Sequence, residues 1–487
     1  MEGELREKCA IAGYCATDPE IPAAFVVRES LRNMQHRGQE ASGIVSEVVE
    51  GQIRYIRGEG YVTSVFPDST MDQLPGPVAI GHNRYSTNGT KNGHKQPVIE
   101  RQKGFSLGLN GNNPTTEKLE TSLKSHNITT SLLNDAEMMA YQIGQTLTQG
   151  HDLPSAIELN SRLGLFGGAY SCVSMHNGQI VAFRDPMGIR PLAIGSTEYG
   201  FATTSETVGL DIIGAEYLHD VEPGYMYVFD QSSSTEYDRI QIADVDGPQK
   251  LDIFEFVYFA RPDSYLYGQR VHEVRKRFGR QLAKEQPVEV KDQDIENTLV
   301  IPVPDTSIPA AEAYAKELGL PFASQAIIKD RYSGRAFITP NGSSLRDLLL
   351  KRKHSFISEE IQGKDLVIID DSIVRMDTAK KIVEEATKNG AKSVVFLSAS
   401  PPVRFPDFYG IDTPSQKELA AANLKVEEMK QELGVKKLGF LSLKGMIDAT
   451  GFSYEDFNLS PFNGEYPIDI GEHRSEIQTP VSMEYAE

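Results

Sequence analysis

The run of branched apolar residues at positions 366–369 constrains the fold of this chain more than any other feature. It reads Leu-Val-Ile-Ile, and the two acids Asp370 and Asp371 follow it directly. A continuous apolar run of this length suits a β-strand covered on both faces, as strands of parallel sheets are. Strand-like and helix-like stretches alternate around it, for example at residues 297–306 and 308–319. The second half therefore predicts an α/β domain with a doubly wound parallel sheet.

The acidic pair stands where ligands of such sheets bind, outside the carboxyl end of a strand. Two adjacent carboxylates there suit a ribose diol and a divalent cation, while N–H groups of the next loop and helix suit a phosphate. A single Asp at this place is more often a solvated turn or N-cap residue. Because the pair is followed by Ser372-Ile-Val-Arg375 and then a helix-like stretch, we favour a binding site.

The N-terminal half follows a different pattern. Residues 9–229 are rich in short β-like runs separated by turn signals, and two helix-like stretches stand out at 23–35 and 135–147. This predicts an α+β domain of stacked sheets and helices. Residues 230–250 are polar and turn-rich, and we expect the domain boundary to lie among them.

Length and charge limit the function classes. A chain of 487 residues suits two domains, which we place at 9–240 and 241–487. The net charge of -19 argues against partners such as nucleic acid or an anionic membrane surface. Residues 1–8 are charged and lack the apolar core of a secretory signal, and no later run is apolar enough to cross a bilayer. A cytoplasmic protein is expected.

The chain has three cysteines, Cys9, Cys15 and Cys172, and free thiols are expected. A cysteine in an apolar strand is usually a small buried hydrophobe, which is how we read Cys15 and Cys172. Cys9 differs because it follows the short charged leader 1–8. If the leader were removed, its thiol could use its own α-amino group, with a pKa near about 8, as the base.

The segment at the acidic pair resembles the phosphoribosyl-pyrophosphate (PRPP) signature of type I phosphoribosyltransferases. Its form, Asp370-Asp-Ser-Ile-Val-Arg375, is similar to that of the amidophosphoribosyltransferase family. Further stretches of the second half resemble this family in its order, namely residues 254–264, 302–315, 327–338 and 401–415. Stretches of the first half resemble the glutaminase half of the family, an N-terminal-nucleophile (Ntn) hydrolase domain, at residues 35–44, 81–89, 109–112, 135–140 and 184–192.

In the second half, the resemblance implies a magnesium and PRPP site. Thr306, Asp370 and Asp371 would surround the metal. The substrate-binding residues that it implies there are Lys329, Arg331, Arg335, Ser372, Arg375 and Thr378. The cations would offset the charge of the pyrophosphate, whose departure leaves an oxocarbenium-like centre. Ordinary surface charge remains the alternative for Arg331 and Arg335.

In the first half, the resemblance assigns Cys9 as the nucleophile. Asn110 and the Gly111 N–H would form the oxyanion hole, of a kind that contributes roughly 3 to 4 kcal/mol per donor. Arg84 would bind the α-carboxylate of glutamine, and Asp135 its α-ammonium group. Asn-Gly is also a common turn dipeptide, and Asp135 could serve as a helix cap.

The implied reaction is glutamine hydrolysis through a thioester on Cys9, with ammonia passed internally to PRPP. The products would be 5-phosphoribosylamine, glutamate and diphosphate, at the entry to de novo purine (IMP) synthesis. The resemblance also implies Mg²⁺, an assembly of identical subunits and feedback inhibition by purine nucleotides. Some members carry an iron–sulfur cluster, but we expect none because the second half contains no cysteine.

The sequence departs from the family pattern in two places. The family usually continues the signature with Gly-Thr-Thr, whereas this chain has Met376, Asp377 and Thr378. Met376 would restrict the backbone, and an Asp377 carboxylate about 4 Å from a phosphate would be repelled by roughly 4 kcal/mol at an effective dielectric near 20. As a helix N-cap, Asp377 would instead occupy the position meant for phosphate. Leu109 stands where histidine commonly precedes Asn-Gly.

Two hypotheses follow from these departures. The first is a working amidotransferase with a modified phosphate loop. The second is a diverged paralogue that has lost PRPP transfer and acts as a glutaminase or a regulatory binding partner. The complete glutamine site and the intact acidic pair favour the first hypothesis.

Overall fold

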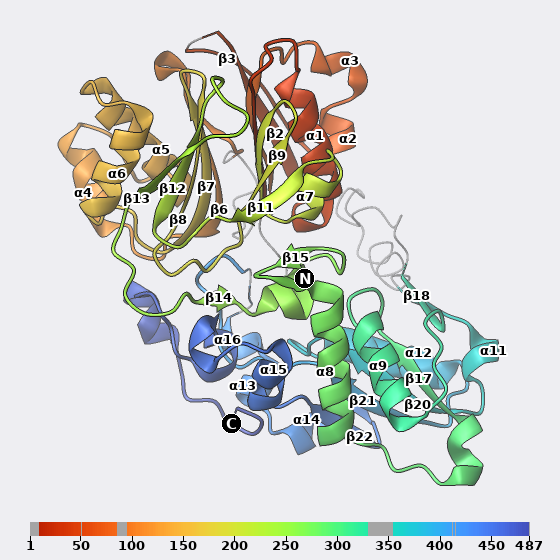
Figure 1. Cartoon of the computed structure of the whole chain (residues 1–487). Helices are drawn as coiled ribbons and strands as arrows, with labels where there is room; N and C mark the ends of the chain where they lie inside the picture. The colour runs from red at the N-terminus through yellow and green to blue at the C-terminus, as the bar shows by residue number, and fades with distance from the viewer. Residues whose placement is uncertain are drawn as a thin grey trace, which may run out of the picture.

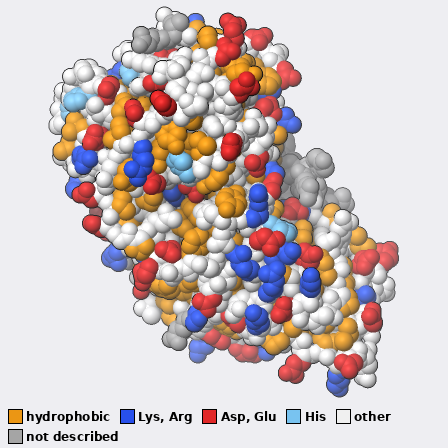
Figure 2. Space-filling model, viewed as in Figure 1, with side chains coloured by type: hydrophobic (Ala, Val, Ile, Leu, Met, Phe, Trp, Pro, Cys, Tyr) orange, Lys and Arg blue, Asp and Glu red, His pale blue; other side chains and the backbone are white. Residues whose placement is uncertain are grey.

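The chain forms two units, which appear as the upper and lower halves of Figure 1. A computed structural model describes residues 9–49, 51–84, 95–329, 354–411, 413 and 415–486. On the face of the molecule that Figure 2 shows, acidic side chains are spread over both units. Lys and Arg side chains gather on this face near α8 (Val271–Glu285). Within the described ranges, no helix combines the length and the apolar character that crossing a membrane requires.

Two antiparallel sheets form the first unit. In spatial order, the first consists of β11 (Glu216–Asp220), β9 (Ala193–Thr197), β10 (Gly200–Thr204), β1 (Ala10–Ala16), β4 (Val78–Arg84), β2 (Ala41–Val49) and β3 (Gln52–Glu59). The second consists of β13 (Asp238–Gln241), β12 (Tyr225–Phe229), β8 (Gln179–Arg184), β7 (Ala169–His176), β6 (Phe105–Asn112) and β5 (Val98–Glu100). Their facing sides share one apolar core, which includes Ile11 of β1 and Val173 of β7.

Helices cover the outer faces of this pair of sheets (Figure 1). Val27 and Leu31 of α1 (Ala23–Asn33) pack in the core behind the first sheet. The second sheet is covered by α4 (Glu117–Ser125), α5 (Asp135–Thr148) and α6 (Leu153–Arg162). The layers run helix, sheet, sheet, helix, so the predicted α+β Ntn-type unit is confirmed. The helix expected at 23–35 ends at Asn33, and a separate 3-10 turn follows at Gln35–Arg37.

The second unit is built on a four-stranded parallel sheet. Its order is β17 (Thr298–Pro302), β20 (Asp365–Asp370), β21 (Ser393–Ser398) and β22 (Lys437–Phe440), and each neighbouring pair is parallel. Further helices are α9 (Ile308–Leu318), α12 (Asp377–Lys388), α14 (Val426–Leu433) and α15 (Leu443–Thr450).

Alternate residues of β20 enter two separate cores. Val367 and Ile369 pack in the core that contains α8, α9 and α15. Leu366 and Ile368 point the other way, into the core with α12 and α14. This two-sided burial is why the strand reads as an unbroken apolar run, and the predicted α/β unit is confirmed.

The two units meet along several contacts. The Lys250 N–H donates to the Met187 carbonyl at 2.7 Å, and the short strand β14 (Leu251–Asp252) then pairs with β23 (Phe457–Asn458) of the second unit. A small apolar cluster at the junction contains Ala169, Ile189, Tyr409 and Ile470. Side chains from both units thus pack together at the junction.

Candidate active sites

The acidic pair lies at the carboxyl end of β20 and is held by its neighbours. Asp370 and Asp371 are only 7% and 8% exposed. The Thr306 hydroxyl donates to Asp371 Oδ2 in a short hydrogen bond, and the Ser372 hydroxyl donates to Asp371 Oδ1 at 2.8 Å. The parallel pairing of β17 with β20 brings the Thr306 loop to this place. The three residues predicted to surround a metal are therefore together.

A pocket that is partly open to solvent adjoins these acids. Predicted site residues among its lining are Thr306, Lys329, Asp370, Asp371, Ser372 and Thr378. Lys329 lies on β18 (Ile327–Lys329), directly opposite His354 of β19 (His354–Phe356), and His354 also lines the pocket. Sequence reasoning assigned no role to His354 or to Tyr258, a further lining residue, although Tyr258 falls in the stretch 254–264.

Three predicted substrate-binding cations do not appear in this lining. Arg331 and Arg335 lie outside the described residues. Arg375 is described, and its guanidinium pairs with Glu418 Oε1 at 2.8 Å. It is not among the residues that border the pocket. Among the described residues, Lys329 is thus the one predicted substrate-binding cation that lines the pocket beside the acids.

The oxygen donors at the acidic pair suit a magnesium ion. Mg²⁺ prefers oxygen ligands and is often held by one or two carboxylates together with substrate phosphates. Asp370, Asp371 and the Thr306 hydroxyl converge from two adjacent strand ends, and this donor set fits. In the described ranges, no cluster of three or more His, Cys, Asp or Glu side chains suits a metal.

The candidate nucleophile Cys9 immediately precedes β1. Ala10 of β1 pairs with Asn83 of β4, so Cys9 and Arg84 adjoin this pair at one end of the two strands. Cys9 is 7% exposed and has a left-handed backbone, with φ 71°. Its carbonyl accepts a hydrogen bond from Arg37 Nε at 3.3 Å. A non-glycine residue in this conformation is uncommon and points to a functional site.

Asn110 and Gly111 lie near the end of β6, a strand of the second sheet. The Asn110 side chain is fully buried, yet neither its nitrogen nor its oxygen has a hydrogen-bond partner in the described part of the chain. An unpaired buried amide costs roughly 1 to 3 kcal/mol and is exceptional in a structural role. Gly111 has φ 143°, and a Cβ there would lie 2.1 Å from the Ala169 carbonyl. The geometry favours an oxyanion site over a turn.

Asp135 lies at the start of α5 but does not cap it. Asn134 is the N-cap and forms a capping box with Glu137. Asp135 Oδ2 instead accepts the Asn113 N–H at 3.0 Å, which fixes the chain just beyond Gly111. The alternative that Asp135 serves as the helix cap is therefore wrong.

Comparison with known proteins gives one consistent result. Residues 66–238 match the family model of a glutamine amidotransferase domain. The amidophosphoribosyltransferase of Synechococcus elongatus is 39% identical over 477 residues, covering 96% of this chain and 92% of that protein. This chain belongs to the amidophosphoribosyltransferase family. The family consists of enzymes that act in the first step of purine biosynthesis.

Solved structures extend the similarity to the whole architecture. The glutamine PRPP amidotransferase from B. subtilis, complexed with ADP and GMP, is 34% identical, with a TM-score of 0.83 over 95% of this chain and 98% of that one. A structure described as the allosteric regulatory enzyme of purine biosynthesis is 33% identical, with a TM-score of 0.84 over 95% and 97% of the two chains. Both Ntn-type and phosphoribosyltransferase-type units are thus shared with this family.

The departure from the family pattern at Met376 lies in the pocket, whereas that at Asp377 does not. Met376 is 3% exposed, lines the pocket and adopts a left-handed backbone with φ 69°. It is also the N-cap of α12, with no side-chain capping bond. Asp377 is exposed, begins α12 and is not a lining residue. The expectation that its carboxylate occupies the phosphate position is wrong, because the helix begins at Asp377 itself, one residue earlier than an N-cap at Asp377 would require.

Leu109, the other departure from the family pattern, is held by hydrogen bonds to its backbone. The Leu109 carbonyl lies 3.0 Å from His82 Nε2, and its N–H donates to Gln96 Oε1 at 2.7 Å. Burial lowers the pKa of His82 to about 3, so the ring is neutral and Nε2 is the donor. Sequence reasoning assigned no role to His82 or Gln96, although His82 lies within the stretch 81–89. These two residues hold the strand that presents Asn110.

The other two cysteines are structural. Burial raises the pKa of Cys15 to about 12 and that of Cys172 well above its usual value. Both thiols stay protonated and pack as small hydrophobes, as the sequence indicated.

His82 makes the stability of this chain depend on pH. Its pKa is about 6.5 in the unfolded chain and about 3 in the folded protein, so the unfolded state binds one more proton between these values. As the pH falls from 6.5 toward 3, the free energy of unfolding should lose about 1.4 kcal/mol per unit from this group. We expect the free energy of unfolding, measured with urea at several pH values, to depend less steeply on pH in His82→Gln than in wild type, by this amount per unit. The exposed His126→Gln serves as the control, and equal slopes in wild type and His82→Gln would contradict the assignment.

Proposed function

We propose that this chain hydrolyses glutamine at Cys9 and transfers the ammonia to PRPP in the pocket beside Asp370 and Asp371. The products are 5-phosphoribosylamine, glutamate and diphosphate. The observation that carries this proposal is the pairing of two prepared sites in one molecule. One holds the buried Asn110 amide, which has no hydrogen-bond partner among the described residues, beside Gly111. The other holds Asp370 and Asp371, the second of which accepts a hydrogen bond from Thr306.

In the glutaminase half, Cys9 acts as the chain terminus once residues 1–8 are removed. Its α-amino group takes the thiol proton, and the sulfur attacks the side-chain carbonyl of glutamine. Asn110 and the Gly111 N–H stabilise the oxyanion, ammonia leaves, and water then hydrolyses the thioester. Arg84 binds the α-carboxylate of the substrate, and Asp135 its α-ammonium group. Removing the leader also ends the constraint on the left-handed Cys9 backbone, which costs about 1 to 2 kcal/mol.

In the transfer half, Lys329 offsets phosphate charge while the first N–H groups of α12, together with Ser372 and Thr378, hold a phosphate group. Asp370, Asp371 and Thr306 would hold Mg²⁺, which neutralises the charge that develops on the departing diphosphate. We also assign Arg331, Arg335 and Arg375 to substrate binding. The first two lie outside the described residues, and Arg375 would have to leave Glu418.

Further parts of the proposal rest on the family. The B. subtilis relative was solved with ADP and GMP, and we assign feedback inhibition by purine nucleotides to this chain. An assembly of identical subunits and the absence of an iron–sulfur cluster remain predictions.

We place the division of the two units between Gln241 and Leu251. Gln241 ends β13 in the second sheet of the first unit, and Leu251 pairs with the second unit.

Replacing the nucleophile separates the two half-reactions. Cys9→Ala should lower glutamine-dependent phosphoribosylamine synthesis by about 10³-fold or more, since an essential nucleophile is lost. Synthesis from PRPP and added ammonium should remain near the wild-type rate, because the transfer site is untouched. Cys15→Ala, six residues further along the chain, is the matched control and should keep both activities. Glutamine-dependent synthesis that persists in Cys9→Ala would refute the nucleophile assignment.

The second candidate function is a glutaminase that has lost PRPP transfer, and the Met376 side chain in the pocket is the observation in its favour. Met376→Gly tests its effect. Relief of the left-handed backbone gains about 1 kcal/mol, but loss of a buried Met side chain costs about 2 to 5 kcal/mol. The variant should therefore be less stable overall.

With its pocket enlarged, Met376→Gly should nevertheless bind PRPP more tightly, with a KM about tenfold lower. Asp377→Thr is the matched variant and should change this KM less than twofold, because its carboxylate is exposed outside the pocket. Steady-state kinetics with ammonium as donor measure both. A larger effect from Asp377→Thr than from Met376→Gly would show that the assignment of these two side chains is wrong.

A further inference from the structure

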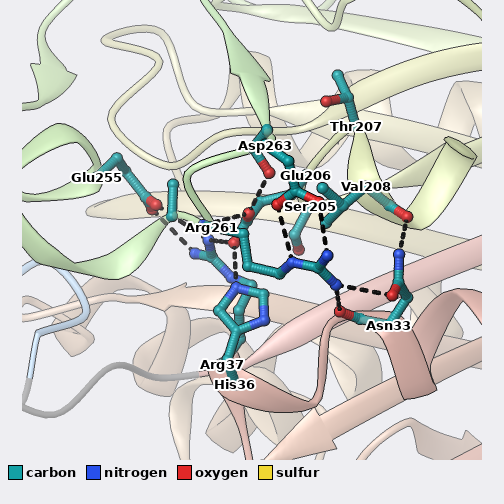
Figure 3. Close-up of polar contacts among 12 residues, drawn as sticks. Asn33, His36, Arg37, Ser205, Glu206, Thr207, Val208, Glu255, Arg261 and Asp263 are labelled. Carbon is teal, nitrogen blue, oxygen red and sulfur yellow. Dashed lines mark hydrogen bonds and ion pairs between the residues drawn. The ribbon is translucent and has the colours of Figure 1, made fainter. Parts of the chain in front are cut away.

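Glu255 of the second unit reaches into the first unit directly behind the candidate nucleophile. Its side chain is fully buried, and its two oxygens accept hydrogen bonds from Arg37 Nη1 and Nη2, both at 2.9 Å. Arg190 Nη2 lies 3.2 Å from Glu255 Oε1. Figure 3 shows Glu255 and Arg37 pointing toward one another. Such a bidentate pair fixes the plane of a guanidinium as well as its position.

The Arg37 guanidinium is the link to Cys9. It is fully buried, and Nε donates to the Cys9 carbonyl at 3.3 Å. Nη1 also pairs with Glu206 at 2.6 Å. Arg37 is thus shared between a carboxylate of its own unit, a carboxylate of the second unit, and the backbone of the nucleophile. Each of these contacts helps to set its orientation.

Glu206 secures the same junction from the other side. Its Oε2 accepts the Arg261 N–H at 3.0 Å and the Ser264 hydroxyl, both from the second unit. His36 Nε2 lies 2.8 Å from its Oε1. Although burial alone would raise the pKa of Glu206, the positive charges of His36 and Arg37 hold it well below its usual range. Glu206 is therefore a fixed anion that would draw Arg37 toward itself if Glu255 were neutral.

The backbone that carries Glu255 is held by further hydrogen bonds. It forms a π-helical turn, Glu255–Phe259, and such turns occur frequently at functional sites. Arg275 of α8 clamps this turn, with Nε on the Phe256 carbonyl and Nη2 on the Ala260 carbonyl, both at 2.8 Å. The position of Glu255 is consequently set by the core of the second unit.

We infer that Glu255 is a positioning residue for the glutaminase reaction, acting through Arg37 on the backbone of Cys9. This inference rests on the proposed role of Cys9 as nucleophile. Without the Glu255 charge, Arg37 turns toward Glu206 and its hydrogen bond to the Cys9 carbonyl is lost. The α-amino group and thiol then shift relative to Asn110 and Gly111. A displacement of about 1 Å in a reacting group can lower a rate by about 10²-fold.

The test uses Glu255→Gln in the full chain that begins at Cys9. The kcat for glutamine hydrolysis should fall about 30- to 100-fold, because Glu255 acts on the position of Cys9. The KM for glutamine should change less than threefold, because substrate binding is assigned to Arg84 and Asp135. Ammonia-dependent synthesis should stay within twofold of wild type. Glu222→Gln, which breaks the pair with Arg239 on the first unit, is the control and should leave all three quantities unchanged.

Two results would overturn the inference. One is a glutaminase kcat within threefold of wild type, and the other is a parallel fall in glutamine- and ammonia-dependent rates, which indicates a purely structural role. If Glu255→Gln does not fold, Glu255→Asp is judged by the same criteria, with a smaller fall in kcat expected because the charge is kept at shorter reach. Glutamine hydrolysis that survives in Cys9→Ala would instead refute the proposed function itself, so the two failures are distinguishable.

Discussion

The buried guanidinium of Arg37 is the interaction on which the contact between the two units behind Cys9 depends. It lies between Glu206 of its own unit and Glu255 of the second unit, and all three side chains are fully buried. Burying such charges carries a desolvation penalty of several kcal/mol per ion, and removing one partner costs about 3 to 5 kcal/mol. The network therefore joins the two units at this junction, where Figure 3 shows Arg37 close to both Glu206 and Glu255. It places the backbone of Cys9 and the turn that carries Tyr258 in one rigid frame.

Much of this architecture could be predicted from the sequence, because its signals are local. The unbroken run at 366–369 reports a strand buried on two sides, and the acids after it fall at the ligand-binding edge of the sheet. The contact between Arg37 and Glu255 could not be predicted, since it joins residues 218 positions apart. Both residues lie in stretches that resemble the family, 35–44 and 254–264, but nothing in either stretch indicates that the two side chains pair.

The phosphate loop shows where prediction from the sequence stops for single residues. The sequence identified Met376 and Asp377 as departures from the family pattern, but which of them faces the substrate depends on where α12 begins. With the N-cap at Met376, the carboxylate of Asp377 turns to solvent and the methionine enters the pocket. Likewise, the sequence shows that Leu109 departs from the family pattern. It does not show that His82 and Gln96 hold this residue, because both bond to its backbone.

In the proposed function, one chain joins glutamine hydrolysis to amination of PRPP. The most direct measurement is the ratio of products formed by protein beginning at Cys9, with glutamine, PRPP and Mg²⁺ all saturating. We expect 5-phosphoribosylamine and glutamate to accumulate in near-equal amounts, and neither to form at this rate when either site is disabled. Glutamate release at saturating PRPP without phosphoribosylamine would contradict this coupling of the two reactions. It would identify the chain as a glutaminase that has lost transfer.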